Sequence, residues 1–137
     1  VPFLCVRLIT GAETMTRRAS TVVDTVAVGV TPGGIHFDGE SIWVANYDSG
    51  NVMRIDPATD TVVATVTVGA APGNILFDGT RIWVTQQGTD LVTKIDPATD
   101  TVIGHFDAGT RTSGIAFDGA YLWMSSNTSH TLIKIHP

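Results

Sequence analysis

Charged side chains are scarce in this sequence of 137 residues, at 15% of the total, against roughly 25% in an average globular domain. So little charge, beside 43% hydrophobic residues, excludes a disordered chain and a heavily solvated helical one. Basic residues are the scarcer kind, 8 against 13 acidic ones, for a net charge of −5. They are also scattered, which excludes nucleic acid and an anionic membrane surface as partners.

Cysteine is limited to Cys5, which excludes an internal disulfide and has no Cys or His neighbour at metal-site spacing. No apolar run approaches the roughly 18 residues of a membrane span. The apolar start at residues 1–9 is interrupted by Arg7 and has no clean cleavage site, so it gives weak support for a signal peptide. The localisation stays open between the cytoplasm and, where a signal peptide has been removed, the periplasm or the exterior.

Known catalytic motifs are absent: the sequence has no GxSxG, no HExxH, no P-loop and no GxGxxG. Glutamate occurs only at Glu13 and Glu40. The Asp residues of the IDPATD segments are explained by turns, in which a side-chain carboxylate bonds nearby backbone N–H groups. A non-catalytic protein is therefore favoured over an enzyme, and no cofactor is predicted.

The sequence is rich in repetition. Residues 21–60 and 61–100 align without a gap at a period of 40, and residues 101–137 continue in the same register. In the second repeat four runs rich in Val, Ile, Thr, Phe and Trp are predicted strands. These runs are Asn74–Phe77, Arg81–Gln86, Leu91–Ile95 and Thr101–Phe106. Four short strands per 40 residues are typical of a propeller blade, so we predict an all-β propeller fold with three blades per chain.

The turns and the tryptophan strands agree with this fold. Asp78-Gly79 and its two equivalents suit tight hairpins in which Gly takes a positive φ. The run Ile82-Trp83-Val84 is apolar without alternation, as a strand is when both faces of its sheet are covered. Blades stacked face to face would supply that cover.

The repeat reads PGxIxFDGxxIWVxxxxxxxVxxIDPATDTVVxTVxVG over residues 32–69. This pattern resembles the YVTN-type β-propeller family and, more distantly, NHL-like and streptogramin-lyase propellers. The resemblance covers residues 21–137 and implies a bacterial binding or scaffold module, although families with this fold differ widely in function. The lyase resemblance implies a divalent metal, carboxylate ligands and a histidine base, but the lyase motif does not match residue by residue.

Three blades are too few to close a ring, because propellers typically have four to eight. The third repeat lacks an outer strand after Thr131–Ile135, and Thr21–Val28 corresponds to that strand by sequence. We therefore predict a homodimer of six blades that exchanges strand 21–28. The alternative is a fragment of a longer propeller with no independent function. Residues 1–20 are interpreted as a decayed half-blade or as a non-native extension.

Function is expected on the face that carries the blade-joining loops and the loops between second and third strands, because these loops differ between repeats while the opposite turns do not. The predicted ligand-binding residues offer amide, hydroxyl, aromatic and charged groups, which suit a small polar ligand or a peptide. They are Asn46, Tyr47, Asp48, Gln86, Gln87, Arg111, Asn127, His130 and His36. Tyr47 and Arg111 together suit a ligand with an apolar ring and an anionic group.

The leading hypothesis is a non-catalytic ligand-binding or scaffold module. The alternative is a small metal-dependent lyase or hydrolase, with Asp48, Asp90 and His130 holding a weakly bound divalent ion. His36 has two interpretations of its own. Two copies could face each other across the channel as a pH-sensitive or metal-binding pair, or each could pack between blades.

Overall fold

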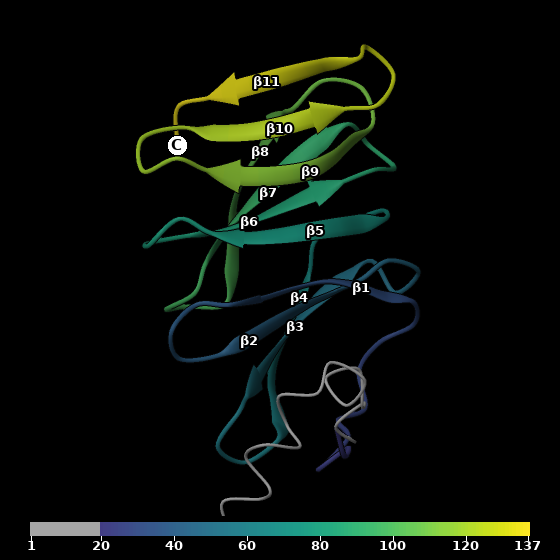
Figure 1. The fold of residues 1–137 in the computed structure, drawn as a ribbon, viewed down its shortest axis with the longest axis vertical. Helices are drawn as coiled ribbons and strands as arrows, with labels where there is room; N and C mark the ends of the chain where they lie inside the picture. Colours follow the sequence, from purple (N-terminus) through teal and green to yellow (C-terminus); the bar gives the residue numbers. More distant parts are fainter. Residues whose placement is uncertain (1–19) are drawn as a thin grey trace, which may run out of the picture.

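The computed structural model describes residues 20–137, which form eleven β-strands and no helix (Figure 1). This part of the chain accordingly has no helix long and apolar enough to cross a membrane. The half-blade or extension predicted in residues 1–20 lies, except for residue 20, outside the described residues.

The strands form three antiparallel sheets in chain order. Blade 1 holds β1 (Pro32–Phe37), β2 (Ile42–Asn46), β3 (Asn51–Asp56) and β4 (Thr61–Thr67). Blade 2 holds β5 (Pro72–Phe77), β6 (Ile82–Gln86), β7 (Leu91–Asp96) and β8 (Thr101–Asp107). Blade 3 holds β9 (Thr112–Phe117), β10 (Leu122–Ser126) and β11 (Thr131–Ile135). The predicted all-β architecture of propeller blades is confirmed, and its completion to six blades stays a prediction.

The three blades stack face to face, with blade 2 in the middle (Figure 1). Between blades 1 and 2, Trp43 and Val52 pack in one apolar cluster with Ile82 of the next sheet. Between blades 2 and 3, Trp83 packs in the equivalent cluster with Leu122. Every residue of β6 is buried, which confirms that the tryptophan strand has both faces covered. The core therefore lies between the sheets and repeats with the sequence.

The Asp-Gly turns take the predicted conformation, with φ near +100° at Gly39, Gly79 and Gly119. In blade 2 the Oδ1 atom of Asp78 accepts the backbone N–H groups of Thr80 and Arg81 at 2.8 and 2.7 Å. These bonds close the hairpin between β5 and β6 and explain why Asp precedes Gly in every repeat.

Residues 21–28 form no strand within the single chain. Val22 and Val23 in this segment are 81% and 95% exposed. The predicted strand exchange needs a second chain, so the pairing of this segment stays a prediction.

Candidate functional site

The loop after the second strand of each blade is bonded to the blade-joining loop before the first strand. Three equivalent backbone hydrogen bonds make this contact. They run from Tyr47 N to Thr31 O at 2.9 Å, from Gln87 N to Ala71 O at 3.0 Å, and from Asn127 N to Arg111 O at 3.2 Å. The two variable loops of each blade are thus held together at one end of its sheet.

The backbone of these loops also repeats where the side chains differ. Thr31, Ala71 and Arg111, at equivalent positions, all have φ between +48° and +54°. Asp90 and His130 have φ of +59° and +56°, at the position where blade 1 has a glycine. Left-handed backbone is unfavourable for non-glycine residues. The hydrogen bonds between the loops therefore hold these residues in a backbone conformation that they rarely adopt.

Between the loops of blades 1 and 2 lies a cavity of about 250 Å³. Its lining includes Thr31, Gly33, Tyr47, Pro72, Asn74 and Gln87. The structure thus brings two predicted site residues, Tyr47 and Gln87, to one cavity, although they lie 40 residues apart in sequence. The side chain of Tyr47 is 39% exposed, and that of Gln87 is half-buried.

The wall of this cavity is fixed by hydrogen bonds. The backbone N–H of Asn74 donates to Thr85 Oγ1 at 3.0 Å. Its side-chain Nδ2 donates to the carbonyl oxygen of Ser113 in blade 3. Asn74 therefore joins two blades. It was not among the predicted site residues because it falls within a predicted strand and not in a variable loop, although its equivalents Gly34 and Gly114 differ from it.

Two predicted site residues, Asn46 and Gln86, lie beneath the loops and are buried. Gln86 Nε2 donates to the backbone oxygen of Val68 at 2.5 Å. Ser126, the equivalent in blade 3, donates its hydroxyl to Thr110 O at 2.6 Å. In blade 1 Asn46 Nδ2 donates to Asn51 Oδ1 at 2.8 Å. These buried side chains fix the ends of the strands from which the loops begin.

The two carboxylates proposed for a metal site each accept a hydrogen bond from a blade-joining loop. Asp48 accepts the hydroxyl of Thr31, and Asp90 Oδ1 accepts the backbone N–H of Arg111 at 2.7 Å. Within residues 20–137 no group of three or more His, Cys, Asp or Glu side chains is placed to hold a metal ion.

The remaining predicted residues lie away from the cavity. Arg111, Asn127 and His130 are exposed on the loops of blade 3, and none of them lines the cavity between blades 1 and 2. His36 is half-buried on β1. Its equivalent Leu76 packs in the cluster between blades 2 and 3, so the repeat puts His36 on the side of β1 that faces blade 2.

Sequence reasoning missed a second role for the Asp of each Asp-Gly turn. The Nε1–H group of the tryptophan five residues later donates to its Oδ2 atom. The bonds are Trp43 to Asp38 and Trp83 to Asp78, both 2.7 Å, and Trp123 to Asp118, 2.8 Å. A basic side chain lies over each tryptophan ring, in the order Arg54, Lys94 and Lys134. The constant Asp-to-Trp spacing in all three repeats was the signal for this unit.

These bonds set the acidity of the turn carboxyls. Partial burial raises the pKa of Asp38 and Asp78, but hydrogen bonds from the tryptophan and the turn backbone outweigh it, so each pKa is lowered. For Asp118 the bond from Trp123, helped by backbone N–H groups, lowers the pKa to about 2. The carboxylates are therefore charged acceptors at neutral pH, and their shifted pKa values have a structural cause.

An ion pair also links blades 1 and 2. Arg54 Nε and Nη2 donate to the two carboxylate oxygens of Asp100 at 2.8 and 2.7 Å. Both side chains are about one quarter exposed. The sequence assigned Asp100 to a turn, and only the stacking of the sheets reveals its partner 46 residues earlier.

Comparison with solved structures finds 241 matching chains. One is hydrazine synthase of Kuenenia stuttgartiensis, a β-propeller-containing protein, with a TM-score of 0.72 at 21% sequence identity. The match covers 85% of this chain and 36% of that one, so the present chain spans about a third of that protein. The similarity shows a propeller-like fold. No family model and no curated protein matches the sequence.

Proposed function

We propose that the chain is a binding module that holds a small neutral polar ligand, or one side chain of a peptide, in the cavity between blades 1 and 2. The observation that carries the proposal is the meeting of Tyr47 and Gln87 at this cavity. Both belong to the loops that differ between repeats, whereas the opposite turns are nearly identical. A surface that varies on a constant scaffold is where binding residues concentrate.

The size of the cavity limits the ligand. At about 250 Å³ it lies below the roughly 300–1,000 Å³ of sites for drug-sized molecules. A single aromatic or amide side chain, or a small ring with one or two polar groups, fits this volume.

The lining chemistry favours a neutral ligand. Tyr47 offers a rigid ring with one hydroxyl group, and Gln87 offers both a donor and an acceptor. Gly33 leaves the backbone open to close approach. None of the described residues that line the cavity is charged, and the predicted cation Arg111 lies on blade 3, so an anionic group is not expected here.

The test is a screen of neutral fragments, each with a single ring or amide, by ligand-observed NMR on the 137-residue chain. Fragments that bind the cavity should lose binding in Tyr47→Ala and in Gln87→Ala. Asn127→Ala is the matched control, because it changes the equivalent loop position of blade 3. Tyr47→Phe should keep the contact with the ring and weaken only fragments that bond the hydroxyl.

Thermal unfolding of each variant checks that the fold is retained, since all three side chains lie on loops. Fragments that bind equally well to the wild type and to Tyr47→Ala would remove the cavity from consideration. Binding abolished by Asn127→Ala alone would move the site to blade 3.

A further inference from the structure

Within residues 20–137 the stack of blades has two largely uncovered faces, one at each end. On blade 1, Ile35 and Phe37 are 66% and 53% exposed. On blade 3, Leu132 is 68% exposed. Apolar side chains this exposed, on sheet faces that are buried elsewhere in the same chain, mark an interaction surface.

Equivalent residues in the other repeats indicate what should cover these faces. Ile35 is equivalent to Ile75, which is 6% exposed because blade 1 covers it. Leu132 is equivalent to Val52 and Val92, both 0% exposed beneath the following blade. The exposed residues of blade 1 are thus those that pack against a preceding blade elsewhere in the repeat. The exposed residue of blade 3 is one that packs against a following blade.

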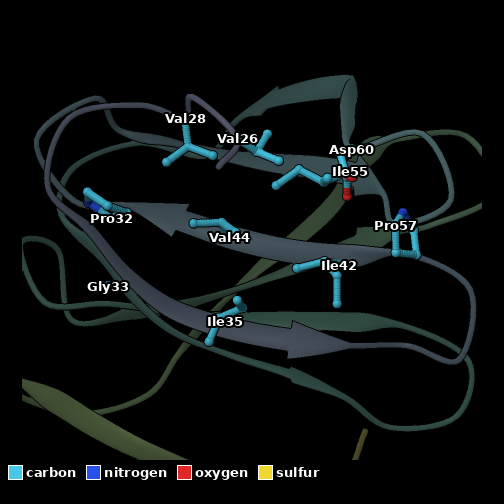
Figure 2. A pocket seen from close by; sticks show the side chains of 10 residues that line it. All are labelled: Val26, Val28, Pro32, Gly33, Ile35, Ile42, Val44, Ile55, Pro57 and Asp60. Atoms are coloured by element: carbon cyan, nitrogen blue, oxygen red, sulfur yellow. The ribbon is translucent and has the colours of Figure 1, made fainter. Parts of the chain in front are cut away.

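Residues 21–28 already occupy part of a preceding blade. Val26 and Val28 line a groove of about 390 Å³ together with Ile35, Ile42 and Val44 of blade 1 (Figure 2). Their equivalents are Val66, in the outer strand β4 of blade 1, and Val68, just after that strand. Both are 5% exposed, in the cluster with Ile75, Ile82 and Val84 of blade 2. The segment therefore lies where the outer strand of a blade before blade 1 belongs.

Blade 3 has the opposite feature. Within the described residues β11 is an edge strand, whereas β4 and β8 cover the equivalent edges of blades 1 and 2. An open strand edge offers a row of unpaired N–H and C=O groups that another strand can bond.

We infer that blade 3 of one copy docks head to tail on blade 1 of a second copy, with residues 21–28 of the second copy added to β11 as the fourth strand. Two copies make two identical joints and six blades, within the usual four to eight. The added strand satisfies the edge by β-augmentation. This inference is independent of the ligand cavity between blades 1 and 2.

The joint also predicts an ion pair. Lys134 is equivalent to Arg54, and Asp60 is equivalent to Asp100, its partner across the joint of blades 1 and 2. Asp60 and Asp100 have the same φ of +54°, and Asp60 lies at the rim of the groove on blade 1 (Figure 2). Lys134 of one copy should therefore meet Asp60 of the other.

Sedimentation velocity of the 137-residue chain tests the docking. The wild type should sediment with a molecular mass twice the 14.5 kDa of the single chain. Ile35→Arg and Leu132→Arg should each give a folded monomer, because both positions are exposed in the single chain. Ile103→Arg is the matched control: Ile103 is 48% exposed although blades lie on both sides of its sheet, and its variant should remain a dimer.

Mixing distinguishes a head-to-tail joint from a symmetric one. An equimolar mixture of Ile35→Arg and Leu132→Arg should form a one-to-one complex, because one of its two joints is wild type on both sides. A joint of blade 1 with blade 1 would not be restored by this mixture. In the same way Asp60→Lys mixed with Lys134→Asp should associate more tightly than either variant alone.

Amide hydrogen exchange tests the added strand. The amides of residues 21–28 should be protected in the wild-type dimer and should exchange at least tenfold faster in the Leu132→Arg monomer. A wild-type monomer at micromolar concentration would overturn the inference and would assign the two faces to further blades of a longer chain. A dimer that survives both Ile35→Arg and Leu132→Arg would overturn it as well.

Discussion

The bond between Asp78 and Trp83 gives the sharpest test of how one blade is held together. Asp78 Oδ2 accepts Trp83 Nε1–H at 2.7 Å, and its Oδ1 accepts the backbone N–H groups of Thr80 and Arg81. Asp78→Asn keeps the shape of the side chain but leaves only one oxygen. If that oxygen keeps the turn bonds, the amide NH₂ faces the indole N–H, and two donors meet.

The expected cost follows from these contacts. Trp83 is 1% exposed, so no water replaces the lost acceptor, and the loss of a hydrogen bond to a charged group costs about 1.5–3 kcal/mol. The two turn bonds change from charged to neutral, which adds about 1 kcal/mol at partial exposure. We expect Asp78→Asn to reduce the free energy of unfolding by about 3 kcal/mol, or the melting temperature by roughly 10 °C.

Urea unfolding at pH 7 measures this difference, with Asp56→Asn as the control. Asp56 bonds one backbone N–H, that of Ala58, at 2.8 Å, and its substitution should cost about 1 kcal/mol or less. A double-mutant cycle of Asp78→Asn with Trp83→Phe should show coupling of about 2 kcal/mol. Equal costs for Asp78→Asn and Asp56→Asn, or no coupling to Trp83→Phe, would refute the reasoning.

Three further predictions follow from other contacts. The pKa of Asp118 is about 2, below its ordinary 3.8, so the stability from its bonds is complete above about pH 4 and is lost as pH falls toward 2; thermal melts of Asp118→Asn should show a weaker loss over this range. Gly34→Ala should destabilise by about 3 kcal/mol in urea unfolding, because the new Cβ would lie 2.8 Å from Asn74 Cα and closer still to the carbonyl oxygen of Gly73; Gly33→Ala, whose Cβ would lie 3.8 Å from the same oxygen, should cost less. A double-mutant cycle of Arg54→Gln with Asp100→Asn should give a coupling of about 1 kcal/mol that falls in high salt.

The strands and turns could be predicted because they depend on local pattern and on the 40-residue period. The predicted strand Leu91–Ile95 differs from β7 by one residue. The first strand of blade 2 begins at Pro72, before the predicted Asn74, because a register shift between Pro72 and Ile75 lets Pro and Gly enter a strand. Proline and glycine are poor strand formers, so propensity alone placed this boundary too late.

The loop residues were harder to interpret, because a polar side chain near a loop has the same sequence signal whether it faces a ligand or the protein. Asn46 and Gln86 carry amides suited to a ligand but are buried at the ends of β2 and β6. Tyr47 and Gln87, one residue later, reach the cavity. Whether a polar residue is the last of its strand or the first of its loop decides whether it is buried or faces the cavity, and this can be judged only once the end of the strand is known.

The contacts between blades could not be predicted, since they depend on how far one sheet is offset from the next. Asp100 looks like a turn residue in sequence, and Arg54 like a surface cation on a strand. Their bidentate pairing requires the turn after β7 to lie beside β3 of the preceding blade. Once the offset is known for one pair of neighbouring blades, the 40-residue period predicts the equivalent contacts for the other pairs.

Comparison of equivalent positions in different repeats also distinguishes two kinds of exposed apolar residue. Val63 and Ile103 occupy equivalent positions on β4 and β8, are 47% and 48% exposed, and stay exposed whether a sheet lies at the end or in the middle of the stack. Ile35 and Ile75 are also equivalent, yet their exposure falls from 66% to 6% once a blade precedes them. The exposure of Val63 thus belongs to its position in the blade, whereas that of Ile35 belongs to the end of the stack. Only side chains of the second kind show which faces the single chain leaves uncovered, and they are the ones to substitute when testing the proposed docking of two copies.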